Sequence, residues 1–362
     1  MGETQRFEPD WVSPPGDTIA DALEELSMTQ AGLAERTGFT RKHVNGLIKG
    51  RVAVTADAAL RLEAVLGEPA SFWLQREAQY REALARRAAR SEAMASREWL
   101  RELPLRWMLE QGWVRKLARK EEQVDECLRF FGVASVGAWR TACAEPLAAF
   151  RASPEVGKKL GSVAAWLRRA ELQAVTVDCV PYDKHAFARA LPALRGLTRQ
   201  TDPTQFVPQV QRACAECGVA VVLVPAPPGC PIHGATRWLA PDRAMLALSV
   251  RHKTDDQFWF SFFHEVAHLL KHGKKLLLVE GIDGLDETLE QEADRFAGDL
   301  LIPPAEARKL AGIRSKARLK TAARDLGVAP GILVGRMQRE GWLPWSHMNG
   351  LKVRYSWESS EG

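Results

Sequence analysis

Two histidines and a glutamate stand at a spacing that suits metal-dependent hydrolysis. The segment reads Phe263-His264-Glu265-Val266-Ala267-His268-Leu269-Leu270. Histidines four residues apart lie on one face of a helix, so both can reach one ion. Glu265 is rotated away from that line but stays close enough to touch a metal-bound water. The pattern therefore predicts a zinc site that has its own catalytic carboxylate.

A zinc ion held by two histidines needs a third protein ligand and an open position for catalysis. The candidates for this ligand are downstream carboxylates, Glu287, Glu290 and Glu292. Glu290 and Asp294 are one helical turn apart, which suits a ligand carboxylate and a second carboxylate that orients a ligand histidine. Glu292 points elsewhere than Asp294, so Glu290 is preferred, with Glu287 and Glu292 as the alternatives.

The alternative to a metal site is a pair of core histidines that share this spacing by chance. That interpretation must explain Glu265, because a carboxylate buried in an apolar helix without a partner is costly. Zinc bound by His264, His268 and Glu290 is therefore the preferred interpretation. Glu265 would then act as the base that takes a proton from water and passes it to the leaving amine, while Asp294 orients a histidine.

A second pattern, at residues 27–50, is typical of DNA-binding proteins. These residues read SMTQAGLAERTGFTRKHVNGLIKG. A short helix, a turn at Gly38 and a second helix form a helix-turn-helix, and the second helix of such a motif lies in the major groove. The predicted base contacts are Thr40, Arg41, Lys42, His43 and Asn45, and the predicted phosphate contacts are Gln30, Lys49 and Arg51.

The alternative for this N-terminal region is a small helical bundle that binds protein. The nearly balanced charge of the first ninety residues favours that alternative. The cations cluster on the third helix, however, and this favours nucleic acid. Double-stranded DNA is therefore the predicted partner.

The helices and strands expected around these residues indicate an α+β fold that is mostly α. Helical periodicity begins at Thr18, and residues 91–200 also read as mostly helical. Strands are expected at 219–224, 237–240 and 244–250, and helices at about 255–272 and 287–301. Five tryptophans are expected to anchor the core of the middle region: Trp99, Trp107, Trp113, Trp139 and Trp166.

The length of 362 residues predicts several domains. We assign a helix-turn-helix domain to 1–90, a helical linker or sensor region to 91–205, a metallopeptidase core with a small sheet to 206–304, and a helical C-terminal extension to 305–362. The net charge of +5 is only a weak argument for nucleic acid. No apolar run approaches the roughly 20 residues of a membrane helix, and the N-terminus lacks a secretory pattern. A cytoplasmic protein without a membrane partner is expected.

The stretch from about Val219 to Pro304 resembles the ImmA/IrrE metallopeptidase family. The matching residues are the strand before the metal helix, Phe260-Ser-Phe-Phe-His264-Glu-Val-Ala-His268, and Glu290-x-Glu-Ala-Asp-x-Phe-Ala-x-x-Leu-Leu-Ile-Pro303. The resemblance implies a compact gluzincin-like fold with Glu290 as the third zinc ligand. It also implies a substrate class, because known members cleave repressors of the helix-turn-helix class.

The N-terminal region resembles the HigA-type antitoxin branch of the XRE family, whose domains are lambda-repressor-like. The resemblance runs from FEPDWVSPPGDTIADALEELSMTQ to Phe72-Trp73-Leu74. It implies a five-helix domain that usually dimerises on a palindromic operator. A homodimer is therefore expected.

Together these patterns predict a DNA-binding transcriptional regulator with a zinc-dependent endopeptidase domain that cleaves an XRE-type repressor or a similar partner. The alternative is a HigA-like antitoxin or transcription factor whose protease fold serves only sensing or partner binding. We expect the strand at 244–250 to be an edge strand, because such an edge could bind an extended substrate by strand addition.

Overall fold

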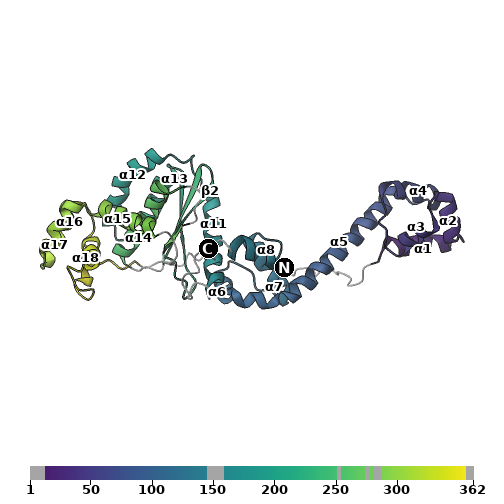
Figure 1. Ribbon diagram of the computed structural model, residues 1–362, viewed down its shortest axis with the longest axis horizontal. Helices are drawn as coiled ribbons and strands as arrows, with labels where there is room; N and C mark the ends of the chain where they lie inside the picture. Colours follow the sequence, from purple (N-terminus) through teal and green to yellow (C-terminus); the bar gives the residue numbers. More distant parts are fainter. Residues whose placement is uncertain (1–12, 145–158, 251–253, 274–277, 281–286, 356–362) are drawn as a thin grey trace. The chain divides into compact units, whose positions relative to one another are not determined.

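The computed structural model describes residues 13–144, 159–250, 254–273, 278–280 and 287–355. The chain divides into two compact units (Figure 1). The first comprises residues 1–97 with 120–122, and the second comprises 98–119 with 123–362. The beginning of the antitoxin-like segment, residues 7–12, lies outside the described residues, as does residue 252.

Five α-helices lie between residues 13 and 95 of the first unit, as the antitoxin resemblance implies. They are α1 (Pro15–Glu25), α2 (Gln30–Thr37), α3 (Arg41–Ile48), α4 (Ala56–Leu66) and α5 (Ala70–Ala95). Threonine side chains cap the N-termini of three of these helices. The hydroxyls of Thr29, Thr40 and Thr55 each accept a hydrogen bond from the backbone N–H three residues further along the chain. An apolar core closes the bundle, with Ile19 and Trp73 fully buried at its centre.

The rest of the chain contains the other helices and a small sheet. The elements are α6 (Leu105–Glu110), α7 (Lys120–Phe131), α8 (Val136–Trp139), α11 (Leu160–Thr176), α12 (Lys184–Gly196), α13 (Pro203–Ala215), β1 (Val219–Val224), β2 (Gly234–Ala240), β3 (Arg243–Ser249), α14 (Asp255–Lys271), β4 (Leu278–Glu280), α15 (Glu287–Leu301), α16 (Pro304–Leu310), α17 (Lys316–Leu326) and α18 (Pro330–Arg339). The predicted fold class, α+β and mostly α, is confirmed. Four of the five expected anchor tryptophans are buried, whereas Trp107 is only half-buried.

The sheet has the strand order β1-β3-β2-β4. The strand β3 pairs with β1 in parallel and with β2 antiparallel, so the prediction of an edge strand at 244–250 was wrong. The reason is that the chain passes from β1 to β2 and then returns to fill the place between them. The fully buried run from Ala244 to Leu248 fits this central position, because both faces of a central strand are covered.

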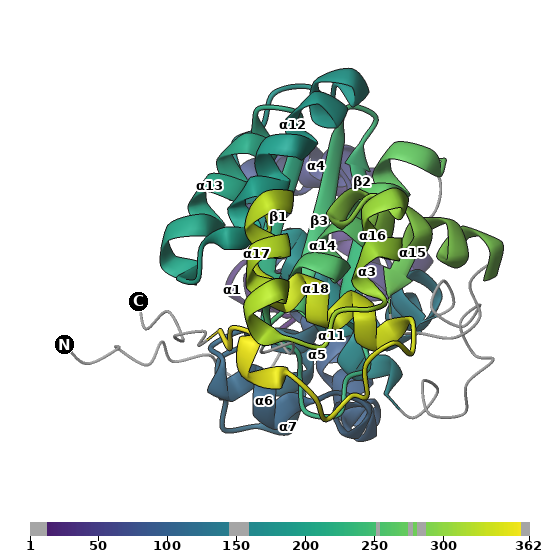
Figure 2. The same ribbon diagram turned by 90° about the vertical axis from the view of Figure 1, so that its left-hand side faces the viewer.

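Helices cover both faces of the sheet. In Figure 1 the helices α11 and α14 lie on opposite sides of the strands, and in Figure 2 the strands β1, β3 and β2 stand side by side behind α14. The indole N–H of Trp166 on α11 donates to the carbonyl oxygen of Val224 at 2.9 Å. On the other face α14 is buried for almost its whole length among the strands, α15 and α18. This burial gives α14, the helix that carries His264 and His268, a fixed position over the sheet.

The C-terminal residues return to the first turn of α14. The carboxylate of Asp255 accepts backbone N–H groups from Asp256, at 3.0 Å, and Val353, at 3.1 Å. The neighbouring Asp256 forms a buried ion pair with Lys352 at 2.6 Å. The Tyr355 hydroxyl accepts the indole N–H of Trp259 at 3.0 Å. The tail thus holds the beginning of the helix that carries the two histidines.

We expect Asp255→Asn to stabilise the protein at pH 8. Burial, together with the charge of Asp256, raises the pKa of the Asp255 carboxyl to about 7. Because this pKa is raised above its unfolded value of about 3.9, the folded state loses stability as the pH rises from about 4 to about 7, by a few kcal/mol. The melting temperature of the variant should exceed that of the wild type at pH 8 and approach it at pH 5. An equal decrease at both pH values would contradict this assignment.

Candidate functional site

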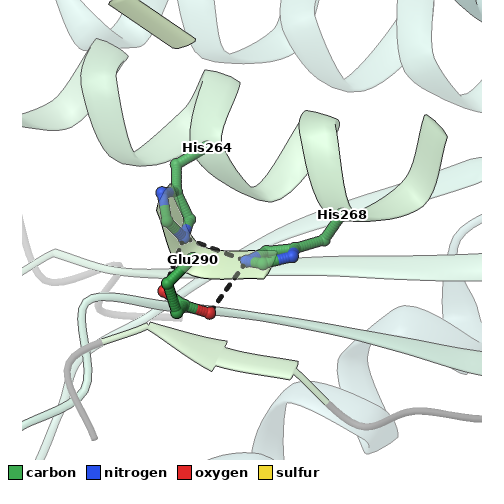
Figure 3. A group of neighbouring side chains, drawn as sticks. All are labelled: His264, His268 and Glu290. Carbon is green, nitrogen blue, oxygen red and sulfur yellow. Dashed lines mark hydrogen bonds and ion pairs between the residues drawn. The ribbon is translucent and has the colours of Figure 1, made fainter. Parts of the chain in front are cut away.

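Two neighbouring helices bring three of the predicted residues together. His264 and His268 project from α14 toward Glu290 on α15 (Figure 3). The two Nε2 atoms are 2.9 Å apart, and they lie 3.2 and 3.4 Å from the two carboxylate oxygens of Glu290. All the donor atoms of this group fall within 4.8 Å of one another. Two imidazoles and one carboxylate that converge in this way match the donor set of a catalytic zinc site.

Asp294 lies directly behind His264. Its Oδ1 atom is 2.9 Å from Nδ1 of His264, the ring nitrogen that faces away from Glu290. The other carboxylate oxygen binds the guanidinium of Arg339 from α18, and that guanidinium lies over the ring of Phe260 at 4.4 Å. A carboxylate in this position fixes the orientation and tautomer of the imidazole. Arg339 was missed by the sequence analysis, because 45 residues separate it from Asp294.

A second chain of contacts supports His268. Its Nδ1 atom is 2.8 Å from Nδ1 of His272, whose Nε2 atom lies 3.4 Å from Glu292. Glu292 also binds Lys271 at 2.8 Å. A neutral His268 whose Nε2 is free for a metal carries its proton on Nδ1, and that N–H can donate to His272. Glu292 therefore contacts His268 only through His272 and does not belong to the converging group.

The Glu265 side chain, which follows His264 on α14, is fully buried. It fits there because β2 presents Gly234 to it. A Cβ atom at position 234 would lie 2.6 Å from Oε1 of Glu265. No larger residue can occupy this strand position without moving the carboxylate, so a glycine 31 residues upstream defines the space for the predicted base.

The pKa values of Glu290 and His268 are both shifted in the direction that favours binding of a cation. Burial acts to raise the pKa of Glu290, but hydrogen bonds from His264 and His268 outweigh it and hold that pKa at about 2. Burial lowers the pKa of His268, so the neutral imidazole is favoured. An ionised carboxylate and a neutral imidazole are the forms that bind a metal ion.

Four polar residues of the sequence are candidates for stabilising an oxyanion in such a reaction: Tyr182, His233, Arg237 and His252. The Tyr182 hydroxyl donates to the carbonyl oxygen of Leu269 at 3.3 Å, and Arg237 forms an ion pair with Glu171. His252 lies outside the described residues. His233 directly precedes Gly234, the residue that touches Glu265.

The helix-turn-helix is built from α2, a turn at Gly38 and α3. Gly38 adopts a φ of +75°, a left-handed conformation that favours glycine. Arg61 from α4 fixes this turn, because it donates to the Thr37 carbonyl oxygen at 3.0 Å and lies over the Phe39 ring at 5.2 Å. The beginning of α3, where base contacts are predicted, is therefore held by a residue that the sequence analysis did not single out.

Most of the predicted DNA contacts lie at the surface. Gln30, Thr40, Arg41, Lys42, Lys49 and Arg51 are exposed, and Asn45 is half-buried. The Thr40 hydroxyl is engaged as the cap of α3, where it accepts the His43 N–H at 3.1 Å. The His43 ring is half-buried against Phe39, with 4.6 Å between the ring centroids. His43 is thus partly engaged within the domain, whereas Arg41 and Lys42 are free to reach a ligand.

Comparison with protein-family models assigns both parts of the chain. Residues 230–338 match the IrrE N-terminal-like domain of the M78 peptidases, and residues 19–73 match a helix-turn-helix model. The chain combines a helix-turn-helix domain with an IrrE N-terminal-like domain. The second match includes His264, Glu265, His268 and Glu290, and it extends through α16 and α17 into α18. Both resemblances drawn from the sequence are thereby confirmed.

Two curated relatives match the helix-turn-helix part. Antitoxin HigA-1 of Vibrio cholerae is 44% identical over 52 residues, which are 14% of this chain and 49% of that protein. The HTH-type transcriptional regulator YddM of Escherichia coli is 30% identical over 60 residues, 17% of this chain and 64% of that protein. The chain thus spans about half of the first relative and less than two thirds of the second. Within the described ranges, no helix has the length and apolar character needed to cross a membrane.

Proposed function

We propose that the protein is a DNA-binding transcriptional regulator with a zinc-dependent endopeptidase site. The observation that carries the proposal is a fully buried glutamate, Glu265, on the same helix as two histidines that converge with Glu290. A purely structural metal site has no need of such a carboxylate. Hydrolysis of a peptide bond, by contrast, requires a base next to the metal.

Each residue of the site has a separate proposed role in the hydrolysis of a peptide bond. His264, His268 and Glu290 would hold the zinc ion, which when bound lowers the pKa of a water and polarises a carbonyl group. Glu265 would take a proton from the attacking water and deliver it to the nitrogen of the leaving amine. Asp294 would keep the His264 ring in place throughout.

The substrate class is proposed from resemblance. Known members of the ImmA/IrrE family cleave helix-turn-helix repressors, so we propose an XRE-type repressor or a similar partner as the substrate. The test is incubation of the zinc-loaded protein with candidate repressors, in parallel with its Glu265→Gln variant. Cleavage by the wild type alone is expected.

A second function is favoured by the match to antitoxin HigA-1. In this alternative the helix-turn-helix regulates transcription, and the protease fold serves only sensing or partner binding. The two candidate functions differ in the role of Glu265, which is a catalytic base in the endopeptidase and has no catalytic role in the regulator. Operator binding without cleavage of any partner would favour the regulator, and the presence of a small toxin gene next to this one would support an antitoxin.

We expect the full-length protein to bind a palindromic operator as a homodimer. Arg41→Ala should weaken specific binding by about 1–3 kcal/mol and relax the base preference at one position, because arginine can contact a guanine with two hydrogen bonds. Arg36→Ala, which replaces an exposed arginine in the last turn of α2, is the matched control. Binding is measured by titration of labelled DNA at several salt concentrations, and it should weaken steeply as salt rises. Equal binding to scrambled DNA at physiological salt would contradict sequence-specific recognition.

A further inference from the structure

The excess positive charge of the chain is concentrated in one short segment of the second unit. Residues 304–326, which form α16, α17 and the turn between them, contain seven lysines and arginines but only two acidic residues, a net charge of +5. The whole chain of 362 residues has the same net charge of +5, so all its other residues together sum to zero. The segment therefore stands out electrostatically from the rest of the protein, the helix-turn-helix domain included.

All seven cations of this segment are exposed. We call them the basic surface: Arg308, Lys309, Arg314, Lys316, Arg318, Lys320 and Arg324. In Figure 1 the helices that carry them lie beyond α14 and α15 from the sheet. Long cationic side chains that all reach solvent can act together on one polyanion.

The two acidic residues neutralise little of the basic surface. Glu306 binds Lys309 at 2.6 Å, and Asp325 lies 3.8 Å from Arg324. Within the described ranges, Lys316, Arg318 and Lys320 form no ion pair with a carboxylate. Most of the charge is therefore available to a ligand.

Three of the cations form a ridge along α17. Lys316, Lys320 and Arg324 follow one another at intervals of four residues, so they lie on one face of the helix. Another face, with Leu319 and Ala323, is buried in the core of the second unit and fixes the helix in place. The ridge is about 12 Å long. Double-stranded DNA carries about seven phosphate charges over that length.

The helices α17 and α18 have the shape of a helix-turn-helix but do not present a helix that could read bases. Gly327 has a φ of +70° and stands three residues before α18, as Gly38 stands three residues before α3. The beginning of α18, however, is packed against α14, and a Cβ atom at Gly331 would lie 2.3 Å from the Asp255 carboxylate. Base recognition requires an exposed helix that can enter the groove. Contacts to phosphates need only the exposed cations.

The surroundings of the ridge favour DNA over a membrane or a protein. The exposed residues between its cations are small or polar, Ala317 and Thr321 among them. A helix that binds a membrane surface needs a free apolar face, whereas the larger apolar residues of α17 pack into the core. Protein interfaces are centred on aromatic or aliphatic anchors. None of the exposed large hydrophobic side chains in the described part of the chain lies within 304–326.

We propose that the basic surface of α16 and α17 binds the phosphate backbone of double-stranded DNA without regard to base sequence. The proposal extends DNA binding to the second unit, and it rests on the proposed function in one respect. An operator held by the helix-turn-helix raises the concentration of DNA around the second unit of the same chain, so that weak contacts to phosphates add to the affinity. Such contacts carry a steep dependence on salt.

The test is the salt dependence of DNA binding by the full-length protein. The probes are a random-sequence duplex and a duplex of equal length from the promoter of its own gene. The ridge variant combines Lys316→Gln, Lys320→Gln and Arg324→Gln. Its plot of log affinity against log salt should be shallower by about 2 to 3 on both duplexes, because each lost phosphate contact removes about 0.9 from the slope. Its preference for the promoter duplex should equal that of the wild type, since the helix-turn-helix is unchanged.

The matched control combines Lys184→Gln, Arg189→Gln and Arg212→Gln, which remove three exposed cations from α12 and α13 of the same unit. The slope of the control should stay near that of the wild type. An unchanged slope in the ridge variant would overturn the proposal. An equal loss of slope in the control would also overturn it, because net charge alone would then explain the effect.

Vesicles of phosphatidylserine and phosphatidylcholine are the third probe. Binding to vesicles that depends on the ridge, with no change in the DNA slope, would overturn the choice of DNA as the partner. A failure of the proposed function looks different. A wild-type protein without preference for the promoter duplex, but with a ridge-dependent slope on random DNA, would contradict operator recognition and leave the basic surface as a DNA-binding site.

Discussion

Glu265→Gln should reduce peptide hydrolysis by about 10²–10⁴-fold, the range that a positioned general base contributes. Glutamine has nearly the same shape as glutamate, so it can occupy the buried space beside Gly234. It cannot take a proton from water, however. Because position 265 is neither one of the three converging ligands nor part of the helix-turn-helix, zinc content and operator affinity should stay at wild-type values.

The matched control for this variant is Glu287→Gln. Glu287 begins α15 and is exposed, so its replacement should leave the hydrolysis rate unchanged. The rates are measured on one substrate with equal amounts of zinc-loaded protein. Hydrolysis that persists in Glu265→Gln would mean that the catalytic base lies elsewhere or that the activity comes from a contaminant.

Glu290→Ala should strip the zinc from the protein. The variant removes one of the three converging ligands, which costs more than the roughly 10–100-fold loss of affinity that follows removal of a residue behind a ligand. The wild type should hold about one zinc per chain. Zinc is measured by metal analysis after dialysis and by chelator competition.

Glu292→Ala is the control for this prediction, because Glu292 lies only two residues away on the same helix. Its carboxylate contacts Lys271 and His272, so its removal should leave most of the zinc bound. If Glu292→Ala alone released the metal, the third ligand would be wrongly assigned. If neither variant released it, the metal would be bound outside this group.

The convergence of His264, His268 and Glu290 was largely predictable because these residues lie on two regular helices. The helix expected at 287–301 has those bounds in the structure, and its periodicity placed Glu290 and Asp294 on one face. The same reasoning on α14 aligned His264 with His268. Spacing along a single helix is a short-range signal that needs no knowledge of the tertiary fold.

The parts that depend on contacts between distant segments were not predictable. Arg339 on α18 contacts Asp294, Gly234 on β2 faces Glu265, and nothing local marks either residue. The place of β3 in the sheet was predicted wrongly, because sequence order does not determine the order of strands. In the helix-turn-helix, His43 was predicted as a base contact, and its packing against Phe39 was not predicted.

The most direct test of the central claim is mass spectrometry of an XRE-type repressor after incubation with the zinc-loaded protein. The account predicts one new pair of termini within the repressor, and it predicts their disappearance when the metal is removed by a chelator and their return when zinc is restored. A repressor that stays intact beside fully zinc-loaded, operator-binding protein, for every candidate repressor tested, would contradict the endopeptidase function. Cleavage that continues after the chelator has removed all zinc would contradict the zinc-dependent mechanism.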